Sequence, residues 1–330
     1  MTDITALKKI VAGYEKPSTA RALWQIINTL VPYTALLCLM RLCLPDWRLV
    51  LPLAMLAGVM LVRVFIIFHD CGHGSFFKSR SANDFFGFIT GMLTFTPYHH
   101  WSWQHSIHHG SAADLDRRGT GDVWTMTVRE YQEATVWKKF SYRVARNPLV
   151  LFFAAPFYLF VVTHRFSSPK ARARERNSVH LMNLAILGMA CAFAWIYGLK
   201  AYLLIQLTML MTMGAIGVWL FYVQHQFEDV YWERGPEWDF VATALQGSSF
   251  YKLPPILQWF TGNIGFHHVH HLSPLVPNYN LERCHNAIPA FRAVKPITLL
   301  SSLKSLSFRL WDEDNKKLVG YEGLRKSKQN

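Results

Sequence analysis

Fifteen histidines occur in the chain, and most of them fall into three short clusters. The first cluster has two histidines four residues apart, and the other two repeat the pattern H-x-x-H-H. Spacings of three and four place side chains on one face of a helix, where imidazoles can share a metal ion. His268 is out of phase and is left outside this set. The eight histidines in phase are His69, His73, His105, His108, His109, His267, His270 and His271.

The number and type of these side chains limit the choice of metal. Eight imidazoles are too many for one ion, whereas two ions with four or five nitrogens each would use them all. Structural zinc sites usually include cysteine ligands, and a hydrolytic H-E-x-x-H site has a glutamate that the first cluster lacks. Imidazole also suits iron, copper and nickel. We favour two iron ions, because a redox metal could activate dioxygen. One H-x-x-x-H pair alone would fit interfacial histidines slightly better than a metal site, but ionisable groups clustered near a membrane are usually functional.

Composition indicates that membrane helices position these clusters. Of the 330 residues, 51% are hydrophobic and only 17% are charged, below the roughly 25% of a soluble domain. Four apolar runs are long enough to cross a bilayer, about 23–44, 49–68, 179–197 and 201–223. Two shorter runs, 85–97 and 149–164, lie between them.

Parity of crossings then predicts the topology. If the three clusters form one site, they lie on one side of the membrane, and an even number of spans separates each pair. We therefore expect 85–97 and 149–164 to be in-plane or re-entrant. The basic segment after residue 164 favours the cytoplasm for this side. The predicted fold is one domain over residues 1–330: an all-α integral membrane protein with four transmembrane helices, two in-plane segments and a cytosolic helical cap carrying the site. Both termini are expected in the cytoplasm.

Net charge and cysteine content restrict the partners. The formal charge is +13, which suits an anionic membrane surface or an acidic redox protein, and the membrane spans argue against nucleic acid. The five cysteines form no C-x-x-C motif, so we expect no disulfide framework and no iron–sulfur centre.

The sequence around the clusters resembles the membrane fatty-acid desaturase family. The similar segments include IFHDCGHGSFF, HSIHHGSAADLDRRGTGDVW, GVWLFYVQHQFED and LQWFTGNIGFHHVHHLSPLVPNYNLE, and the likeness to bacterial acyl-lipid desaturases of the delta-5 type extends to FRLWDEDN. The resemblance implies that the eight histidines bind two non-haem iron ions. It also suggests His225 as a ninth ligand, although an interfacial histidine bonded to Glu228 or Asp229 is the alternative.

Residues beyond the ligands are also candidates for the site. Carboxylates commonly orient ligating imidazoles through the other ring nitrogen. Asn263, four residues before His267, is expected either beside the metal ions or as a helix cap. The isolated His285 is expected to be structural. Each single carboxylate fits a solvated surface charge better than a partner of an imidazole, and the candidates are Asp70, Asp114, Asp116, Asp122, Glu228 and Asp229.

The activity implied by the resemblance is O2-dependent insertion of a cis double bond into saturated acyl chains of membrane phospholipids, in a bacterial inner membrane. No dinucleotide fingerprint or fused haem module is present, so an external donor of the ferredoxin or flavodoxin type is expected. Alternatives are a di-iron hydroxylase of alkyl chains or carotenoids and, from another class, a membrane metal-transport protein. The basic residues expected to bind either the donor or anionic lipid are Lys138, Lys139, Arg143, Arg146, Arg172, Arg174 and Arg176.

Overall fold

Four long helices form the apolar body of the molecule in the computed structural model, which describes residues 4–322 and residue 324. They are the helices whose length and hydropathy suit a membrane span, and they confirm the four predicted runs. Each begins a few residues before its run, and α3 and α10 also end a few residues beyond it. Their bounds are α2 Thr19–Cys43, α3 Trp47–His73, α9 Ala173–Tyr197 and α10 Leu199–His225.

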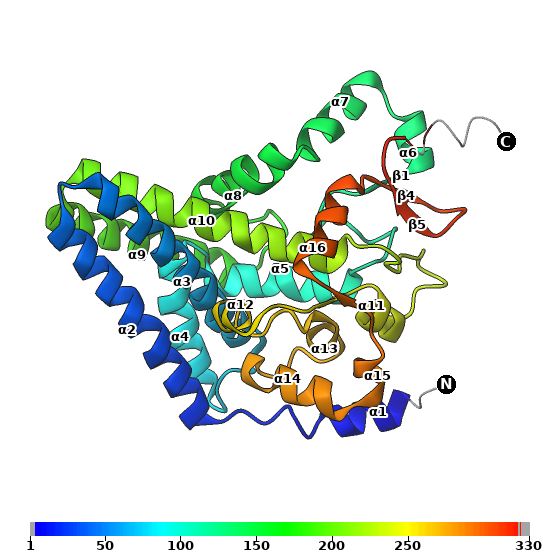
Figure 1. Ribbon diagram of the computed structural model, residues 1–330, viewed down its shortest axis with the longest axis horizontal. Helices are drawn as coiled ribbons and strands as arrows, with labels where there is room; N and C mark the ends of the chain where they lie inside the picture. The colour runs from blue at the N-terminus through cyan, green and yellow to red at the C-terminus, as the bar shows by residue number, and fades with distance from the viewer. Residues whose placement is uncertain (1–3, 323, 325–330) are drawn as a thin grey trace.

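The four helices form two antiparallel pairs with short connections. Residues 44–46 join α2 to α3, and Gly198 with a φ of 82° joins α9 to α10. Both connections lie at the left of Figure 1, whereas α1 (Ile4–Val11) and β5 (Lys317–Val319) lie at the right. The ends of α3 and α10 that carry histidines therefore point to the same side as these terminal elements. This arrangement agrees with an even number of crossings between the clusters.

Local sequence explains where the first pair begins and ends. The Ser18 side chain accepts a hydrogen bond from the Arg21 N–H at the start of α2, and Asp46 accepts one from the Arg48 N–H at the start of α3. Gly74 ends α3 in the left-handed region with a φ of 71°. The helix therefore continues past the apolar run as far as His73, as the sequence predicted.

Two glycines allow α3 and α10 to pack closely against their neighbours. A Cβ at Gly58 would lie 2.7 Å from the Met209 carbonyl oxygen, so only glycine permits this approach of α3 to α10. A Cβ at Gly214 would lie 2.6 Å from Pro156 Cβ. Small residues at helix contacts are the usual means of close packing in a membrane.

The two shorter apolar runs form helices that are not long spans. The first is α4 (Arg80–Leu93), which has 14 residues. The second is irregular around Pro156, since proline has no N–H to donate, and the segment 150–165 is bent by 65° from α7 (Val136–Ala145). Length and hydropathy allow this pair to count as a fifth, broken span, so its in-plane placement remains a prediction. The elements of the second run are η1 Val150–Ala154, α8 Ala155–Phe157, η2 Tyr158–Val162 and η3 Thr163–Arg165.

Short helices surround the ends of α3 and α10 and form the cap. The third histidine cluster lies on α13, which packs against α11, so these two helices close the site from one side (Figure 1). The cap helices are α5 Tyr98–Ser111, α6 Val128–Glu133, α11 Phe240–Gln246, α12 Pro255–Phe260, α13 His267–Leu272, α14 Asn278–Ala287, α15 Pro289–Arg292, α16 Leu299–Ser302 and η4 Leu303–Ser307.

The fold is mostly helical, as predicted, and the described part of the chain adds five short strands. They form two small sheets, in the orders β1-β4-β5 and β2-β3. β4 pairs with β1 in parallel and with β5 antiparallel, so the C-terminal hairpin attaches to the segment that follows the second cluster. The strands are too short to show an alternating pattern. The remaining strands are β1 Met126–Thr127, β2 Phe250–Tyr251, β3 Pro296–Ile297 and β4 Leu310–Asp312.

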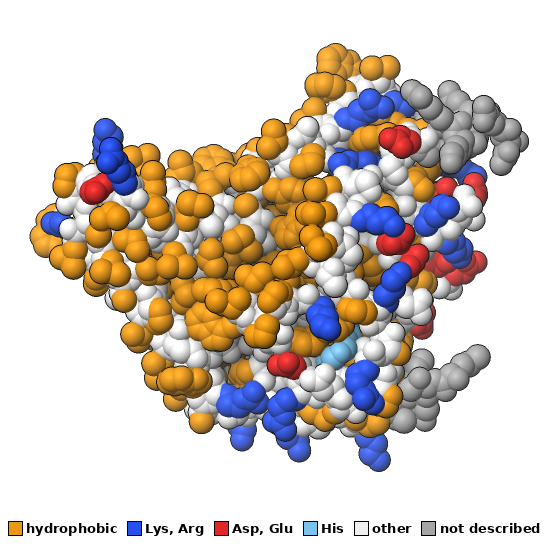
Figure 2. Space-filling model, in the orientation of Figure 1, with side chains coloured by type: hydrophobic (Ala, Val, Ile, Leu, Met, Phe, Trp, Pro, Cys, Tyr) orange, Lys and Arg blue, Asp and Glu red, His pale blue; other side chains and the backbone are white. Residues whose placement is uncertain are grey.

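Surface chemistry follows the same division. In Figure 2 hydrophobic side chains cover most of the left and centre of the molecule, over α2, α3 and α10, whereas lysines and arginines gather along the lower and right edges and at the upper left tip. Large apolar side chains such as Leu42 of α2 and Trp195 and Leu184 of α9 are exposed. An apolar band of this kind suits contact with lipid, and the charged edges suit the headgroup and solvent regions.

Candidate metal centre

Three helices bring five imidazoles together into a first group. His69 and His73 come from α3, His105 and His109 from α5, and His270 from α13. One ring nitrogen from each lies within 4.8 Å of the others. The Nε2 atoms form a chain of contacts, at 3.1 Å from His69 to His105 and 3.0 Å from His109 to His270.

A second group lies directly beside the first. It contains His108 of α5, His225 at the end of α10 and His271 of α13. His267 belongs here too, because its Nε2 atom is 3.0 Å from that of His225 and 3.1 Å from that of His271. The structure thus places the eight predicted histidines and His225 in two adjacent groups of five and four.

Hydrogen bonds at the outer ring nitrogens fix which nitrogen faces inward. His69 Nδ1 is 3.0 Å from a carboxylate oxygen of Asp70, and His108 Nδ1 is 2.8 Å from one of Asp122. His225 Nδ1 is 3.3 Å from the carbonyl oxygen of Gly247. These acceptors require Nδ1–H, so Nε2 is left as a lone pair that points into the group. Such outer partners are typical of metal-binding imidazoles.

Burial keeps the imidazoles of the cap in the neutral form that a metal requires. Burial, followed by repulsion from neighbouring histidines, holds the pKa of His105, His109, His270 and His271 well below the usual value. The Nε2 atoms of His73 and His108 are buried without a hydrogen-bond partner among the described residues.

These observations fit metal ions as the common partner of the nine nitrogens. Nitrogens about 2 Å from a shared ion lie roughly 3 Å apart, close to the contacts found here. Hydrogen bonds among the imidazoles cannot satisfy all of these nitrogens. The inward Nε2 atoms of His69, His108 and His225 carry no hydrogen, so each of them can only accept. The centre therefore suits two ions, and this chemistry agrees with the metal-binding interpretation of the sequence.

Asp70 joins the first cluster to the segment after the third. Its Oδ1 faces His69, while its Oδ2 accepts hydrogen bonds from the backbone N–H of Asn278 at 2.6 Å and from its side-chain amide at 2.8 Å. All three residues are buried. Asp70 thus lies where a partner of a ligating histidine was predicted, whereas Asn278 carried no signal in the sequence.

Asp122 is the second carboxylate that reaches the centre. Its other oxygen accepts the Gly119 N–H at 3.2 Å, and Gly119 has a φ of 112°, which favours glycine. The turn that follows the second cluster therefore folds back to hold His108. Asp122 was one of six candidate carboxylates, and only the fold distinguishes it.

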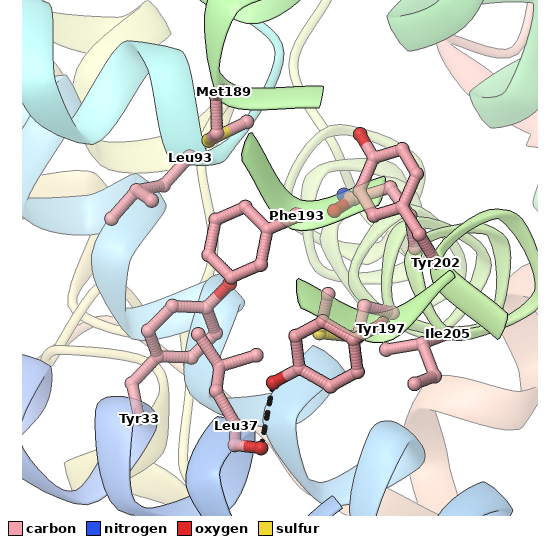
Figure 3. A pocket seen from close by; sticks show the side chains of 10 residues that line it. Tyr33, Leu37, Leu93, Met189, Phe193, Tyr197, Tyr202 and Ile205 are labelled. Carbon is pink, nitrogen blue, oxygen red and sulfur yellow. Dashed lines mark hydrogen bonds between the residues drawn. The ribbon is translucent and has the colours of Figure 1, made fainter. Parts of the chain in front are cut away.

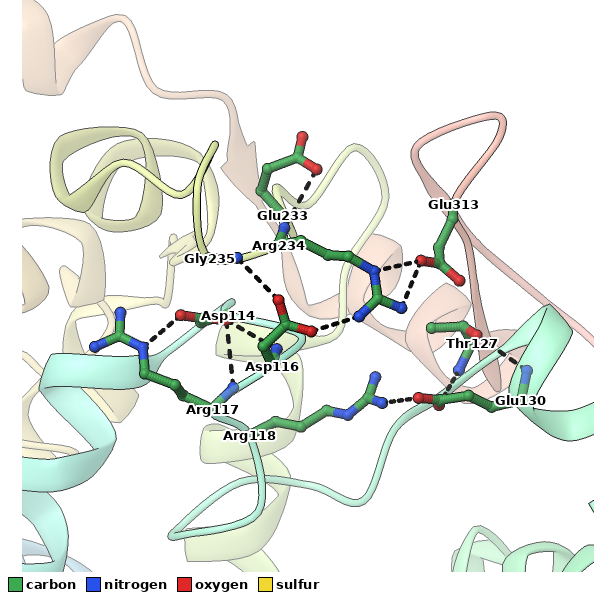
Figure 4. A network of polar contacts seen from close by, with 10 residues as sticks. All are labelled: Asp114, Asp116, Arg117, Arg118, Thr127, Glu130, Glu233, Arg234, Gly235 and Glu313. Carbon is green, nitrogen blue, oxygen red and sulfur yellow. Dashed lines mark hydrogen bonds and ion pairs between the residues drawn. The ribbon is translucent and has the colours of Figure 1, made fainter.

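The neighbouring acids Asp114 and Asp116 do not contact imidazoles, contrary to their candidacy. Figure 4 shows them in a network of ion pairs and backbone contacts that fastens the loop after α5 to the loop at 233–235. Asp114 accepts the Arg117 guanidinium at 2.5 Å, and Asp116 pairs with Arg234. Arg234 also reaches Glu313 in the β4–β5 turn. These residues stabilise the cap.

Three further expectations around the second group need correction. Glu228 pairs with Lys304, and Asp229 pairs with Lys295 at 3.2 Å, both on the surface, so neither is the partner of His225. The Asn263 side-chain amide donates to the Asn278 carbonyl at 3.0 Å, and its oxygen accepts from Gln258. Asn263 thus neither contacts a histidine nor caps α13, although it supports the segment that holds Asp70.

His268 and His285 form a separate buried pair outside the centre. His268 Nε2 is 3.0 Å from His285 Nδ1, and Phe250 and Phe266 pack against the pair. Burial, with the neighbouring imidazole as a smaller cause, lowers the pKa of His268 to about 3. Its exclusion from the ligand set agrees with this position, and His285 is structural but not isolated.

Aromatic rings cover the outer sides of the imidazoles. Trp101 stacks on His105 with ring centroids 4.3 Å apart, and Phe221 lies 5.0 Å from His225 and 5.3 Å from His108. These rings limit ring rotation and exclude water. Phe221 falls in a run interpreted only as a membrane span, so no sequence signal singled it out.

One of the predicted docking charges lies in the interior. Arg146 is 2% exposed and its guanidinium contacts Gln226, Tyr222 and the Phe308 carbonyl. It holds the C-terminal segment against the end of α10 and cannot meet a partner. The other six remain candidates.

An apolar cavity lies inside the bundle, far along the helices from the histidines. Figure 3 shows side chains of α2, α4, α9 and α10 around it, including Tyr33, Phe193 and Tyr202. Tyr197 donates a hydrogen bond to the Leu37 carbonyl at 2.7 Å across its wall. Its volume is only about 10 Å³, so the helices are nearly in contact here.

Comparison with known proteins gives an independent result. The family model described as fatty acid desaturase matches residues 45–298. A fatty acid desaturase of Bacillus subtilis is 49% identical over 320 residues, which cover 97% of this chain and 91% of that protein. An sn-1 acyl-lipid omega-3 desaturase (ferredoxin) of Synechocystis is 27% identical, covering 74% and 66%, and an sn-1 oleoyl-lipid 12-desaturase of the same organism is 26% identical, covering 70% and 66%.

Proposed function

The chain belongs to the fatty acid desaturase family, and on this premise we propose that it is an O2-dependent acyl-lipid desaturase. It introduces a cis double bond into saturated acyl chains of membrane phospholipids. The observation that carries the proposal is the convergence of nine imidazoles in two adjacent groups beside an apolar helical bundle. The whole chain acts as one membrane desaturase domain.

Two non-haem iron ions are the proposed cofactors. His69, His73, His105, His109 and His270 would hold one ion, and His108, His225, His267 and His271 the other. Bound iron would supply the oxidising chemistry that removes two hydrogens from adjacent methylenes with O2 and two electrons.

The chain itself supplies orientation and a dry environment. Asp70 and Asp122 hold the rings of His69 and His108 in fixed tautomers. Trp101 and Phe221 shield the imidazoles, and burial keeps the cap histidines neutral. The acyl chain must reach this centre from the bilayer, because its methylenes are soluble only there.

Electrons are proposed to come from an external donor of the ferredoxin or flavodoxin type. The name of the Synechocystis relative includes ferredoxin, which supports this class. Such donors are acidic proteins, and a surface with six candidate lysines and arginines would attract them. The same charges would favour anionic lipid at the cytoplasmic face.

The proposed location is the bacterial inner membrane, with both termini and the metal centre in the cytoplasm. The basic segment that precedes α9 supports this orientation. Delta-5 selectivity is the finer proposal for the position of the double bond, and the resemblance of the sequence segments to acyl-lipid desaturases of the delta-5 type supports it.

Expression in a host without unsaturated lipids tests the activity. Gas chromatography of the fatty-acid methyl esters, with location of the double bond, should show a new monounsaturated product. His108→Ala should abolish the product and bind less iron. His180→Ala, which changes an exposed histidine outside both groups, should retain both. An alcohol as the product would favour a hydroxylase, and full iron content in His108→Ala would remove it from the ligand set.

A further inference from the structure

A polar cavity of about 480 Å³ opens beside the metal centre. His73 forms part of its wall, and the other lining residues come from the turn after α3 and from the starts of α4, α5 and α9. Of the nine clustered histidines, His73 is also one of only two that are not fully buried. The cavity is therefore a route from the surface to the edge of the centre.

Unpaired positive charge is the main chemical feature of this cavity. Lys78 and Arg80 are exposed at its rim, and neither forms an ion pair or hydrogen bond with another residue in the part of the chain that the structure describes. Arg174 faces Asp84, although their closest atoms are 3.9 Å apart. An anion that entered the cavity would meet two free cations.

The two carboxylates that line the cavity do not pair with Lys78 or Arg80. Asp84 faces Arg174, and the Oε2 atom of Glu175 is buried in the protein with no hydrogen-bond partner among the described residues, so it does not open into the cavity. The cavity thus suits a ligand that carries an anion.

The cavity lies at the level where lipid headgroups are expected. Arg174 and Glu175 belong to the first turn of α9, a candidate membrane span. Basic side chains at the cytoplasmic end of a span are well placed for lipid phosphate. The phosphate of a glycerophospholipid matches the two unpaired cations, Lys78 and Arg80.

We propose that this cavity is the headgroup subsite for the phospholipid substrate, and that it sets the position of the double bond by counting from the ester. The inference rests on the proposed acyl-lipid function. In a delta-5 product only four bonds separate the ester carbon from the first carbon of the double bond. The glycerol must then lie next to the irons while the acyl chain reacts, and the cavity that contains His73 is adjacent to them.

The test compares two substrates and two variants of the full-length enzyme in lipid nanodiscs. Saturated phosphatidylglycerol and diacylglycerol with the same acyl chains are supplied with one electron donor at a fixed, saturating level. The double variant Lys78→Gln/Arg80→Gln removes the unpaired cations. The matched control is Lys252→Gln/Arg283→Gln, which removes two exposed cations that lie outside the cavity.

Wild type and control should favour phosphatidylglycerol over diacylglycerol. In the cavity variant this preference should fall about tenfold, because the KM for the phospholipid rises. A change of this size is expected from the loss of one or two charge-assisted contacts. It should also give a mixture of double-bond positions. Inorganic phosphate should inhibit wild type more than the cavity variant.

Other results would overturn the proposal in distinct ways. An unchanged headgroup preference with a single double-bond position would exclude the cavity as a headgroup subsite. In a second series, with the donor varied at saturating phospholipid, an increase in the KM for the electron donor alone would assign Lys78 and Arg80 to donor docking. Absence of any unsaturated product from wild type would instead contradict the proposed function and leave the headgroup preference undefined.

Discussion

At the scale of single residues, the centre depends on groups that accept a hydrogen bond from the outward Nδ1 of a histidine. Asp70, Asp122 and the Gly247 carbonyl leave three inward Nε2 lone pairs. A carboxylate in this position also makes the ligand more basic. Loss of one such partner should therefore weaken the centre without removing a ligand.

Asp122→Asn tests this expectation. The amide can present its N–H to His108 and so favour the wrong tautomer, which should lower metal affinity by roughly 10- to 100-fold. Iron per protein after dialysis against a chelator, together with turnover, measures the effect. Asp116→Asn, on the exposed network of Figure 4, should retain iron and turnover. Equal iron retention in the two variants would contradict the role of Asp122.

The buried cap histidines predict a dependence of stability on pH. Burial lowers the pKa of His268 to about 3 and of His285 to about 4, and lowers the pKa of His105 and His270 as well. Above about pH 6.5 these groups are neutral in both the folded and the unfolded protein. As the pH falls below that value, only the unfolded chain gains protons, so folding stability is lost.

Each such histidine should cost about 1.4 kcal/mol per pH unit between its unfolded and folded pKa values. The melting temperature of metal-free protein in detergent should therefore fall steadily from pH 7 to pH 5. His268→Asn together with His285→Asn should reduce the slope. A melting temperature that stays constant over this range would show that these imidazoles are not held neutral.

At the scale of elements, contact between α3 and α10 sets the distance between the helix ends that carry His69 and His225. Gly58 is the point of closest approach. A side chain there would separate the helices and with them the two groups of histidines.

Gly58→Ala should destabilise the protein by about 2 kcal/mol through overpacking. The added Cβ would lie 2.7 Å from the Met209 carbonyl oxygen and from Thr212 Cβ. Gly188→Ala in α9, where nothing lies within 4 Å of the new Cβ, should stabilise by about 0.5–1 kcal/mol. Thermal unfolding in detergent should give shifts of opposite sign, and shifts of the same sign would contradict this packing.

The elements themselves were largely predictable, since apolar runs of about 20 residues and histidine spacings of three and four are local signals. The four spans and the single face of α5 follow from them. The partners of Asp70 and Arg146 were not predictable, because Asn278 and Phe308 are 208 and 162 residues away. Arg146 was wrongly assigned to the surface, since a basic stretch does not reveal which arginine turns inward. The short strands are held by distant pairing and carry no periodic pattern.

At the scale of the whole molecule, all site-bearing helix ends lie on one side. The turns at 44–46 and at Gly198 lie on the other (Figure 1). A cytoplasmic centre requires those turns to face outward.

Labelling of single cysteines in a cysteine-free variant tests the orientation. Lys200→Cys, beside the α9–α10 turn, should react with a membrane-impermeant maleimide added to spheroplasts. Asn315→Cys, in the exposed β4–β5 turn, should react only after the membrane is opened. Reaction of both sites in intact spheroplasts would contradict the proposed topology.

The two oxygens of Asp70 have a consequence for biosynthesis. One oxygen contacts His69, the preceding residue in the chain. The other accepts a hydrogen bond from Asn278, which the ribosome adds more than two hundred residues later. The nascent protein therefore inserts its first helical hairpin long before the contact between Asp70 and Asn278 can fix the position of His69. The centre therefore reaches its final geometry only near the end of translation, after Asn278 has been added.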